Sequence, residues 1–160
     1  MDLKDYDENG SRFERPSVRG IIFKDDKIAL VHSKKYDYYK CPGGGCKKGE
    51  NLVETLIREV QEETGLTVSN LQNCGYIQWY NPVKQSQYFV FLFKTSTFSG
   101  ELKDSVEGKV KWMTLEEMLA GKLAPNMTKY LAVFQNETIQ QAYGISGQGL
   151  SVLDNNGKVL

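Results

Sequence analysis

Glu59, Glu62 and Glu63 are the residues whose type and spacing could do chemistry. In a helix, positions i, i+3 and i+4 lie on one arc. Three carboxylates there repel one another by roughly 0.2–0.5 kcal/mol per pair even on an exposed helix, and a divalent cation removes that repulsion. Oxygen ligands without His or Cys nearby favour Mg²⁺ or Mn²⁺ over zinc. For the glutamates alone, the alternative is a solvated helix face.

A glycine run precedes these glutamates. Gly43, Gly44 and Gly45 follow Pro42, and three consecutive glycines indicate a loop. Backbone N–H groups of a glycine loop next to a helix start can bind phosphate oxygens, although an ordinary turn is the alternative for the glycines alone. A phosphate-binding loop beside a carboxylate cluster indicates metal-assisted phosphoryl chemistry.

A longer pattern joins these two features. Gly44, Glu50 and the run Arg58-Glu59-Val60-Gln61-Glu62-Glu63-Thr64-Gly65-Leu66 resemble the complete signature of the Nudix hydrolases. The resemblance implies an α/β (α+β) fold of the Nudix type, an α/β/α sandwich with a mixed β-sheet between helices. It also implies hydrolysis of the pyrophosphate linkage of a nucleoside diphosphate joined to another moiety, with Mg²⁺ or Mn²⁺. Nucleoside triphosphates, ADP-ribose-like compounds and dinucleotides are the substrate classes.

The resemblance further implies roles by position. Glu59, Glu62 and Glu63 would be metal ligands, and Glu62 or Glu63 would also orient the attacking water. A main-chain carbonyl near Gly43 or Gly44 would complete the metal's shell.

Basic residues and glycines around the carboxylates would support them and bind substrate. The resemblance implies that Arg58 holds the carboxylates in place and pairs with Glu50, although an ordinary surface ion pair is the alternative for Arg58. Substrate phosphates would meet Gly44, Gly45 and Lys47, and a solvated charge is the alternative for the lysine.

The general base lies outside the signature. Many Nudix enzymes resemble one another in taking it from a glutamate in a later loop, just before a strand such as Lys109–Met113. Glu107 fits best, because Gly108 would let the loop bend towards the carboxylate helix. Glu101 and Asp104 are further candidates. If all of these are solvated loop carboxylates, Glu62 or Glu63 is the base.

Aromatic residues could stack on a nucleobase. Trp79 and Tyr80 are the main candidates, although strand aromatics more often belong to a core. Residues outside the signature that could indicate the substrate are equivocal. Pro82 lies close to where ADP-ribose-cleaving relatives carry a proline, but a loop proline between strands needs no such explanation.

The elements that must position these residues follow from local patterns. Apolar β-branched runs predict a hairpin of 18–23 and 28–32, strands at 71–80 and 88–98, and a short strand at 109–113. Caps predict a helix at 51–64, ended by Gly65, and a helix from Thr114 to near Gly121. A last helix is expected at 127–143, ended by Gly144. The expected division is a polar lead-in (1–16), a Nudix hydrolase domain (17–144) and a tail (145–160) with a small hairpin at Asn156-Gly157.

Composition excludes several classes of function. The 160 residues include 20 Lys and Arg and 20 Asp and Glu, so no basic surplus indicates a nucleic acid polymer or a membrane surface as partner. The longest apolar run, Tyr88–Phe93, is far shorter than the roughly 20 residues of a membrane span. The charged N-terminus predicts no secretory signal, hence a cytoplasmic protein. The single histidine, His32, cannot build a Ser-His-Asp nucleophile.

Two other functions remain open on these residues. One is a module that senses nucleotides or sugar nucleotides without turnover, although none of the signature glutamates is lost. The other is a Nudix enzyme acting on a non-nucleotide diphosphate. The partner is in each case a small molecule, and the sequence leaves homodimer formation open.

Overall fold

The computed structural model describes residues 12–135 and 141–160. The strands are β1 (Arg12–Phe13), β2 (Ser17–Lys24), β3 (Lys27–Ser33), β4 (Tyr38–Lys40), β5 (Gly43–Gly45), β6 (Thr67–Ser69), β7 (Gln72–Asn81), β8 (Ser86–Thr95), β9 (Thr97–Ser99), β10 (Gly108–Thr114), β11 (Gln141–Ile145) and β12 (Gly149–Val152). The helices are α1 (Leu52–Thr64), α2 (Leu115–Ala120) and α3 (Met127–Gln135). None of these helices is long and apolar enough to span a membrane.

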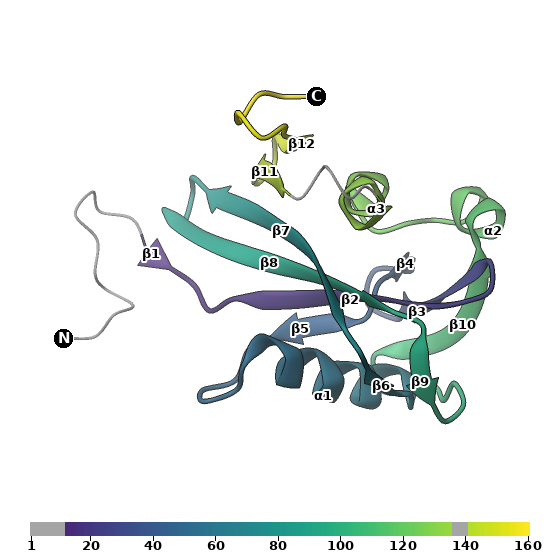
Figure 1. The fold of residues 1–160 in the computed structure, drawn as a ribbon. Helices are drawn as coiled ribbons and strands as arrows, with labels where there is room; N and C mark the ends of the chain where they lie inside the picture. Colours follow the sequence, from purple (N-terminus) through teal and green to yellow (C-terminus); the bar gives the residue numbers. More distant parts are fainter. Residues whose placement is uncertain (1–11, 136–140) are drawn as a thin grey trace.

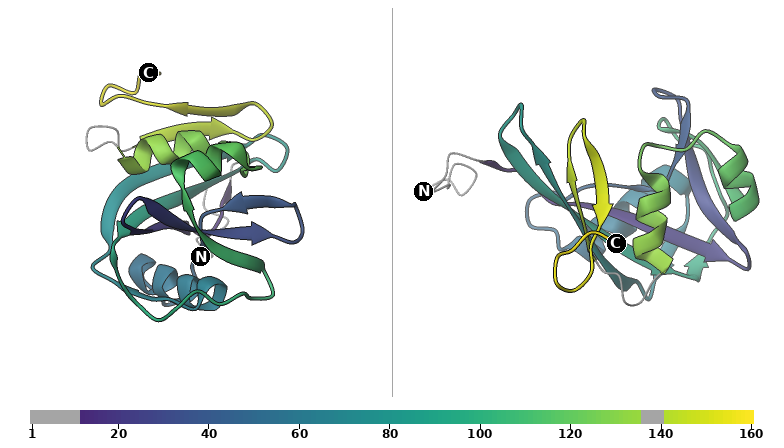
Figure 2. Two further views of the ribbon diagram at one scale, coloured as in Figure 1. Left: turned by 90° about the vertical axis from the view of Figure 1, so that its right-hand side faces the viewer. Right: turned by 90° about the horizontal axis from the view of Figure 1, so that it is seen from above.

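A mixed, curled sheet forms the centre of the molecule. Its strand order is β10-β3-β2-β8-β7-β11-β12. Three short strands lie off this path: β1 pairs with β8, β4 pairs with β3, and β5 pairs with β2. β2 runs parallel to β8 and β11 runs parallel to β7, whereas β3 and β12 are antiparallel to their neighbours. α1 covers one face, and α2 and α3 cover the other (Figures 1 and 2). The predicted sandwich of helices around a mixed sheet is confirmed.

The side chains of β2 alternate between the two faces of the sheet, and each face has its own hydrophobic cluster. Val18 and Ile22 belong to the cluster that packs under Leu56 of α1. Ile21 belongs to the cluster on the opposite face, which includes Leu131 of α3. Because neighbouring side chains of a strand point to opposite faces, Arg19 shares the α3 side with Ile21.

Local signals placed several elements correctly. The predicted hairpin is β2–β3, in which Lys24 pairs with Lys27 across the turn. Asn51 caps α1 by accepting a hydrogen bond from the Glu54 N–H at 2.9 Å. Gly65, at φ 81°, ends the helix, as predicted.

Three predicted elements differ from the structure. The strand predicted at 88–98 is divided, because β8 ends at Thr95 and Thr97–Ser99 form β9, which pairs with β6 in a separate sheet. Gly43, Gly44 and Gly45 form the strand β5, antiparallel to β2, rather than a loop. A Cβ on Gly43 would lie 2.0 Å from the Val18 carbonyl oxygen, so this strand approaches β2 too closely for a side chain at that position. The last helix ends at Gln135, and the predicted helical residues 141–143 belong to β11; residues 136–140 lie outside the described residues.

The strand β11 forms because the sheet offers it a partner. Gly144, predicted as a helix stop, pairs in parallel with Trp79 of β7. A Cβ at Gly144 would lie 2.4 Å from the Trp79 ring, so the glycine allows close contact with the indole. At the two ends, β1 pairs with β8, and Leu153 pairs with Val159 around the Asn156-Gly157 turn.

Candidate functional site

The three glutamates of α1 differ in burial. The helix directs Leu56 and Val60 into the core beneath the sheet, and the glutamates lie on the flank beside that stripe. Glu63 is 4% exposed, whereas the side chains of Glu59 and Glu62 are 16% and 55% exposed. One helical arc therefore presents a buried, a half-buried and a solvated carboxylate.

Arg58 joins the loop before α1 to two of these glutamates. Its guanidinium donates to both carboxylate oxygens of Glu50, from Nε at 2.7 Å and from Nη2 at 3.0 Å. Nη1 donates to Glu59 at 2.9 Å and lies 3.5 Å from Glu62. Nη2 also donates to the Gly45 carbonyl at 3.2 Å. This planar, two-pronged contact fixes the loop, the strand β5 and the helix relative to one another.

Glu50 is held ionised by these contacts. The hydrogen bonds from Arg58, followed by the Lys47 N–H, lower the pKa of Glu50 to about 2. The same pairing raises the pKa of the Arg58 guanidinium. The pair therefore remains charged across the pH range in which the protein would act.

Glu63 is the buried carboxyl of the site. Its Oε2 accepts the Gly43 N–H at 2.7 Å. Burial raises its pKa to about 7, against the opposing effects of the Gly43 hydrogen bond, Arg19 and Lys40. A carboxyl that titrates near neutrality beside other carboxylates is typical of functional sites.

The three glycines of β5 each lie against a charged side chain. A Cβ on Gly44 would lie 2.5 Å from Oε1 of Glu59. On the alternate positions, Gly43 lies against the aliphatic stem of Arg19, and Gly45 lies against the guanidinium of Arg15. The strand therefore has a carboxylate on one face and two arginines on the other.

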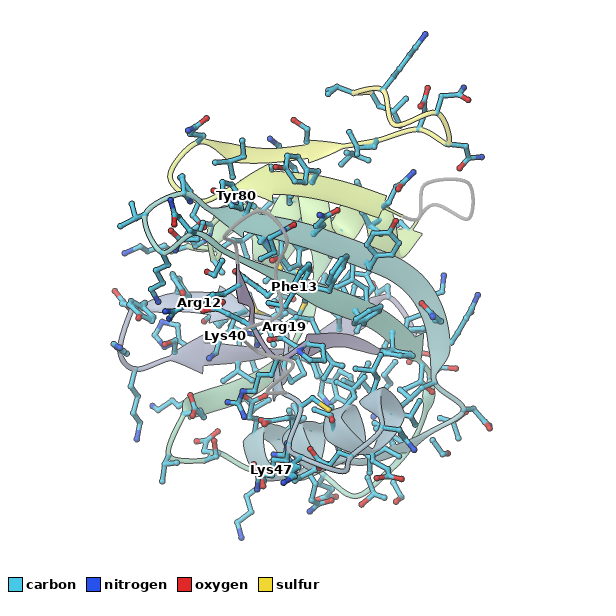
Figure 3. All side chains as sticks on the ribbon, turned by 90° about the vertical axis from the view of Figure 1, so that its left-hand side faces the viewer. Arg12, Phe13, Arg19, Lys40, Lys47 and Tyr80 are labelled. Atoms are coloured by element: carbon cyan, nitrogen blue, oxygen red, sulfur yellow. The ribbon has the colours of Figure 1, made fainter. Side chains whose placement is uncertain are left out.

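Arg19 and Lys40 form a cationic pair that the sequence analysis missed. Arg19 donates to the Cys41 carbonyl at 3.1 Å, and both side chains line a cavity of about 140 Å³. Figure 3 shows Arg19 and Lys40 close together on the face that also carries β1. A charged residue within the apolar run 18–23 was the available signal, because alternation places it on the same face as Ile21.

The comparisons with known proteins decide the family. A family model for the NUDIX domain matches residues 14–134. The chain belongs to the Nudix family. It is 28% identical over 111 residues to the uncharacterized Nudix hydrolase YvcI of Bacillus subtilis (strain 168), which covers 66% of this chain and 69% of that protein.

Two further similarities concern an enzyme of stated activity and a solved structure. The Nudix chain is 32% identical over 96 residues to an ADP-ribose pyrophosphatase of Methanocaldococcus jannaschii, covering 58% of this chain and 57% of that enzyme. It is similar to the crystal structure of a MutT protein from Bacillus halodurans, with a TM-score of 0.71 and 26% identity over 92% of this chain and 95% of that one.

The Nudix signature maps onto one continuous site. It begins at Gly44 of β5, passes Glu50, and ends beyond the carboxylate arc of α1. The expected pairing of Arg58 with Glu50 is present in the structure. Lys47, the predicted phosphate contact, donates its backbone N–H to Glu50 at 2.7 Å, and its exposed side chain appears in Figure 3.

Glu107 lies at the margin of this site. It directly precedes β10, and its carboxylate is 3.6 Å from the ammonium of Lys40, which acts electrostatically on Glu63. The Glu107 side chain is 52% exposed. Asp104 is used locally, because its carboxylate accepts the Val110 N–H at 2.9 Å. Glu107 thus faces Lys40 whereas Asp104 is engaged within its own loop, and the role of Glu107 as the base stays a prediction.

The structure separates the two aromatic candidates. Trp79 lies in the core, where its indole N–H donates to the Tyr130 hydroxyl at 3.2 Å and its ring covers Gly144. Tyr80, the next residue, is partly exposed and is labelled in Figure 3. Of these two side chains, Tyr80 is the one with a surface available for stacking on a base.

By their chemistry, the carboxylate oxygens of the arc are suitable ligands for a divalent metal ion. Within the described ranges, no group of three or more His, Cys, Asp and Glu side chains is arranged so that it could hold a metal ion. Instead, Arg58 supplies positive charge between Glu59 and Glu62. Hard oxygen donors around a buried Glu63 match a hard cation, and Nudix hydrolases use divalent metal ions.

Proposed function

We propose that this Nudix hydrolase uses Mg²⁺ or Mn²⁺ to cleave the pyrophosphate linkage of a nucleoside diphosphate joined to another moiety. The observation that carries the proposal is Glu63: a buried carboxyl, fixed by the Gly43 N–H, with its pKa raised to about 7 on the carboxylate arc of α1. Burial of an ionisable group destabilises the fold unless something compensates for the charge. A bound cation would add to the compensation that the Gly43 N–H, Arg19 and Lys40 already supply.

The chain's own residues prepare this site in three ways. Glu59, Glu62 and Glu63 would hold the metal, which when bound polarises a phosphoryl oxygen and lowers the pKa of water. Arg58 keeps Glu59 oriented and, through Glu50, fixes the helix against the preceding loop. The N–H of Gly43 fixes one oxygen of Glu63, so that this carboxylate has a single orientation.

Hydrolysis requires a group that accepts a proton from water. As water attacks phosphorus and the bond to the leaving phosphate oxygen breaks, the proton moves to a carboxylate. Glu63 and Glu62 lie on the arc itself, and Glu107 is connected to the site through Lys40. We propose Glu107 as the base, with the glutamates of the arc as the alternative.

The substrate proposal is supported by the relatives. An ADP-ribose pyrophosphatase is among them, and a MutT protein shares the fold. ADP-ribose is therefore the compound to test first, and dinucleotides and nucleoside triphosphates complete the panel.

The test is hydrolysis of this panel with Mg²⁺ and with Mn²⁺, measured as release of phosphate or nucleotide. Glu63→Gln is expected to lower turnover by at least ~100-fold. Glu54→Gln is the matched control on the same helix, because Glu54 contacts Asn51 at the helix start and not the arc. Nucleotide binding without turnover in the parent would contradict the proposal and indicate a sensing module.

A further inference from the structure

The strand β5 separates two surfaces of opposite charge. Glu59 lies over Gly44 on the α1 side, whereas Arg19 lies over Gly43 on the other side. Lys40 lies just before β5, at the end of β4, and lines the same cavity as Arg19. Glu59 and Arg19 therefore lie on opposite sides of β5, and Lys40 lines the cavity on the side of Arg19.

The cavity on the cationic side has a polar lining. Two tyrosines, Tyr38 from β4 and Tyr130 from α3, complete it together with the sulfur-containing and small residues Cys41, Met127, Ala124 and Pro125. Its volume of about 140 Å³ is well below the roughly 300–1,000 Å³ of pockets that enclose a whole drug-sized ligand. The cavity therefore suits one chemical group rather than a complete nucleotide.

The charges in this cavity are incompletely balanced. Within residues 12–135 and 141–160, Arg19 forms no ion pair, and its hydrogen bond goes to the neutral Cys41 carbonyl. Lys40 contacts Glu107 at 3.6 Å, and that carboxylate is half exposed. An anionic ligand would complete the balance.

We propose that Arg19 and Lys40 bind a phosphate monoester carried by the part of the substrate beyond the scissile diphosphate. The inference rests on the proposed function and narrows its substrate class to nucleotide diphosphates with an additional phosphate. A guanidinium presents paired donors to phosphate oxygens, an ammonium adds a compact charge, and tyrosine hydroxyls supply further donors. A neutral nucleobase would leave the Arg19 guanidinium, which has no carboxylate partner among the described residues, desolvated without compensation.

The test compares adenosine 5′-monophosphate with adenosine 2′,5′-bisphosphate and adenosine 3′,5′-bisphosphate, by calorimetric titration of the full chain without metal. At least one bisphosphate is expected to bind about tenfold or more tightly than the monophosphate, the scale of a charge-assisted hydrogen bond. Arg19→Met and Lys40→Met should each remove most of that preference, and Arg19→Lys should restore part of it. Lys158→Met, in the C-terminal hairpin, is the matched control and should retain the preference.

Three outcomes would overturn the inference. One is equal affinity of the parent for the monophosphate and both bisphosphates. Another is a loss of affinity in Arg19→Met and Lys40→Met by the same factor for all three nucleotides, which would assign the cations to the diphosphate itself. The third is an unchanged preference in both variants. If Arg19→Met does not fold, as judged by its melting temperature, Lys40→Met decides alone.

Hydrolysis with Mg²⁺ separates this inference from the proposed function. If the protein prefers a bisphosphate but hydrolyses none of the diphosphate panel, the anion subsite is supported and the proposed activity is contradicted. If the protein hydrolyses the panel but shows no such preference, the proposed activity is supported and the anion subsite is contradicted.

Discussion

Replacing Glu63 by glutamine is expected to stabilise the protein when no divalent metal is present. Burial raises the pKa of this carboxyl from 4.5 to about 7. Glutamine keeps an oxygen that can accept the Gly43 N–H and carries no charge. Since one pKa unit corresponds to about 1.4 kcal/mol, removing the charge increases the free energy of unfolding by at most about 3 kcal/mol above neutral pH.

The pH dependence of this difference has a defined sign. Below pH 4.5 the carboxyl is protonated in both the folded and the unfolded chain, so the parent and Glu63→Gln should be equally stable with respect to this group. Between 4.5 and about 7 the unfolded chain ionises first, and the parent loses stability as the pH rises. Above about 7 the difference reaches its full size and stays constant.

The measurement is thermal or urea unfolding of both proteins in EDTA at several pH values. A gain of the full size corresponds to a melting temperature higher by roughly 6–12 °C for a chain of this length. Glu54→Gln, at the exposed start of α1, should show no comparable pH-dependent gain. If Glu63→Gln is no more stable than the parent above neutral pH, or if its gain is the same at every pH, burial of a charged Glu63 is not what raises the pKa.

Three further predictions concern the carboxylates and their surroundings. Gly44→Ala should lower turnover by about tenfold or more with the fold retained, because the new Cβ would lie 2.5 Å from Glu59; Gly121→Ala, where the nearest atom is 3.4 Å away, is the steady-state kinetic control. Millimolar Mg²⁺ should raise the melting temperature of the parent, and Glu59→Ala should show much less of this rise; an equal rise would place the metal elsewhere. Glu107→Gln should lower turnover and flatten the acidic limb of the pH–rate profile while Mg²⁺ affinity stays largely intact, and a profile like that of the parent would leave Glu62 or Glu63 as the base.

The sequence by itself determined the elements whose signals are local. The β2–β3 hairpin and both ends of α1 follow from residues within a few positions of one another, since caps and turns satisfy nearby backbone groups. The carboxylate arc of α1 is equally local, because helical spacing alone groups Glu59, Glu62 and Glu63. The Nudix signature then indicated the pairing of Arg58 with Glu50, which the structure contains.

The tertiary structure decided what depends on partners distant in the chain. Whether Gly43, Gly44 and Gly45 form a loop or a strand depends on β2, whose close approach requires residues without a side chain. Whether residues 141–145 continue a helix depends on the free edge of β7, which they extend as β11.

The same long-range packing made the members of the carboxylate arc different from one another. Helical spacing treats Glu62 and Glu63 alike, yet one side chain is solvated and the other is buried against the Gly43 N–H of β5. Arg19 comes to line a cavity in the same way, because β4, α3 and the segment just before α3 pack around it. Burial and electrostatic surroundings are properties of packed elements, and no short stretch of sequence contains them.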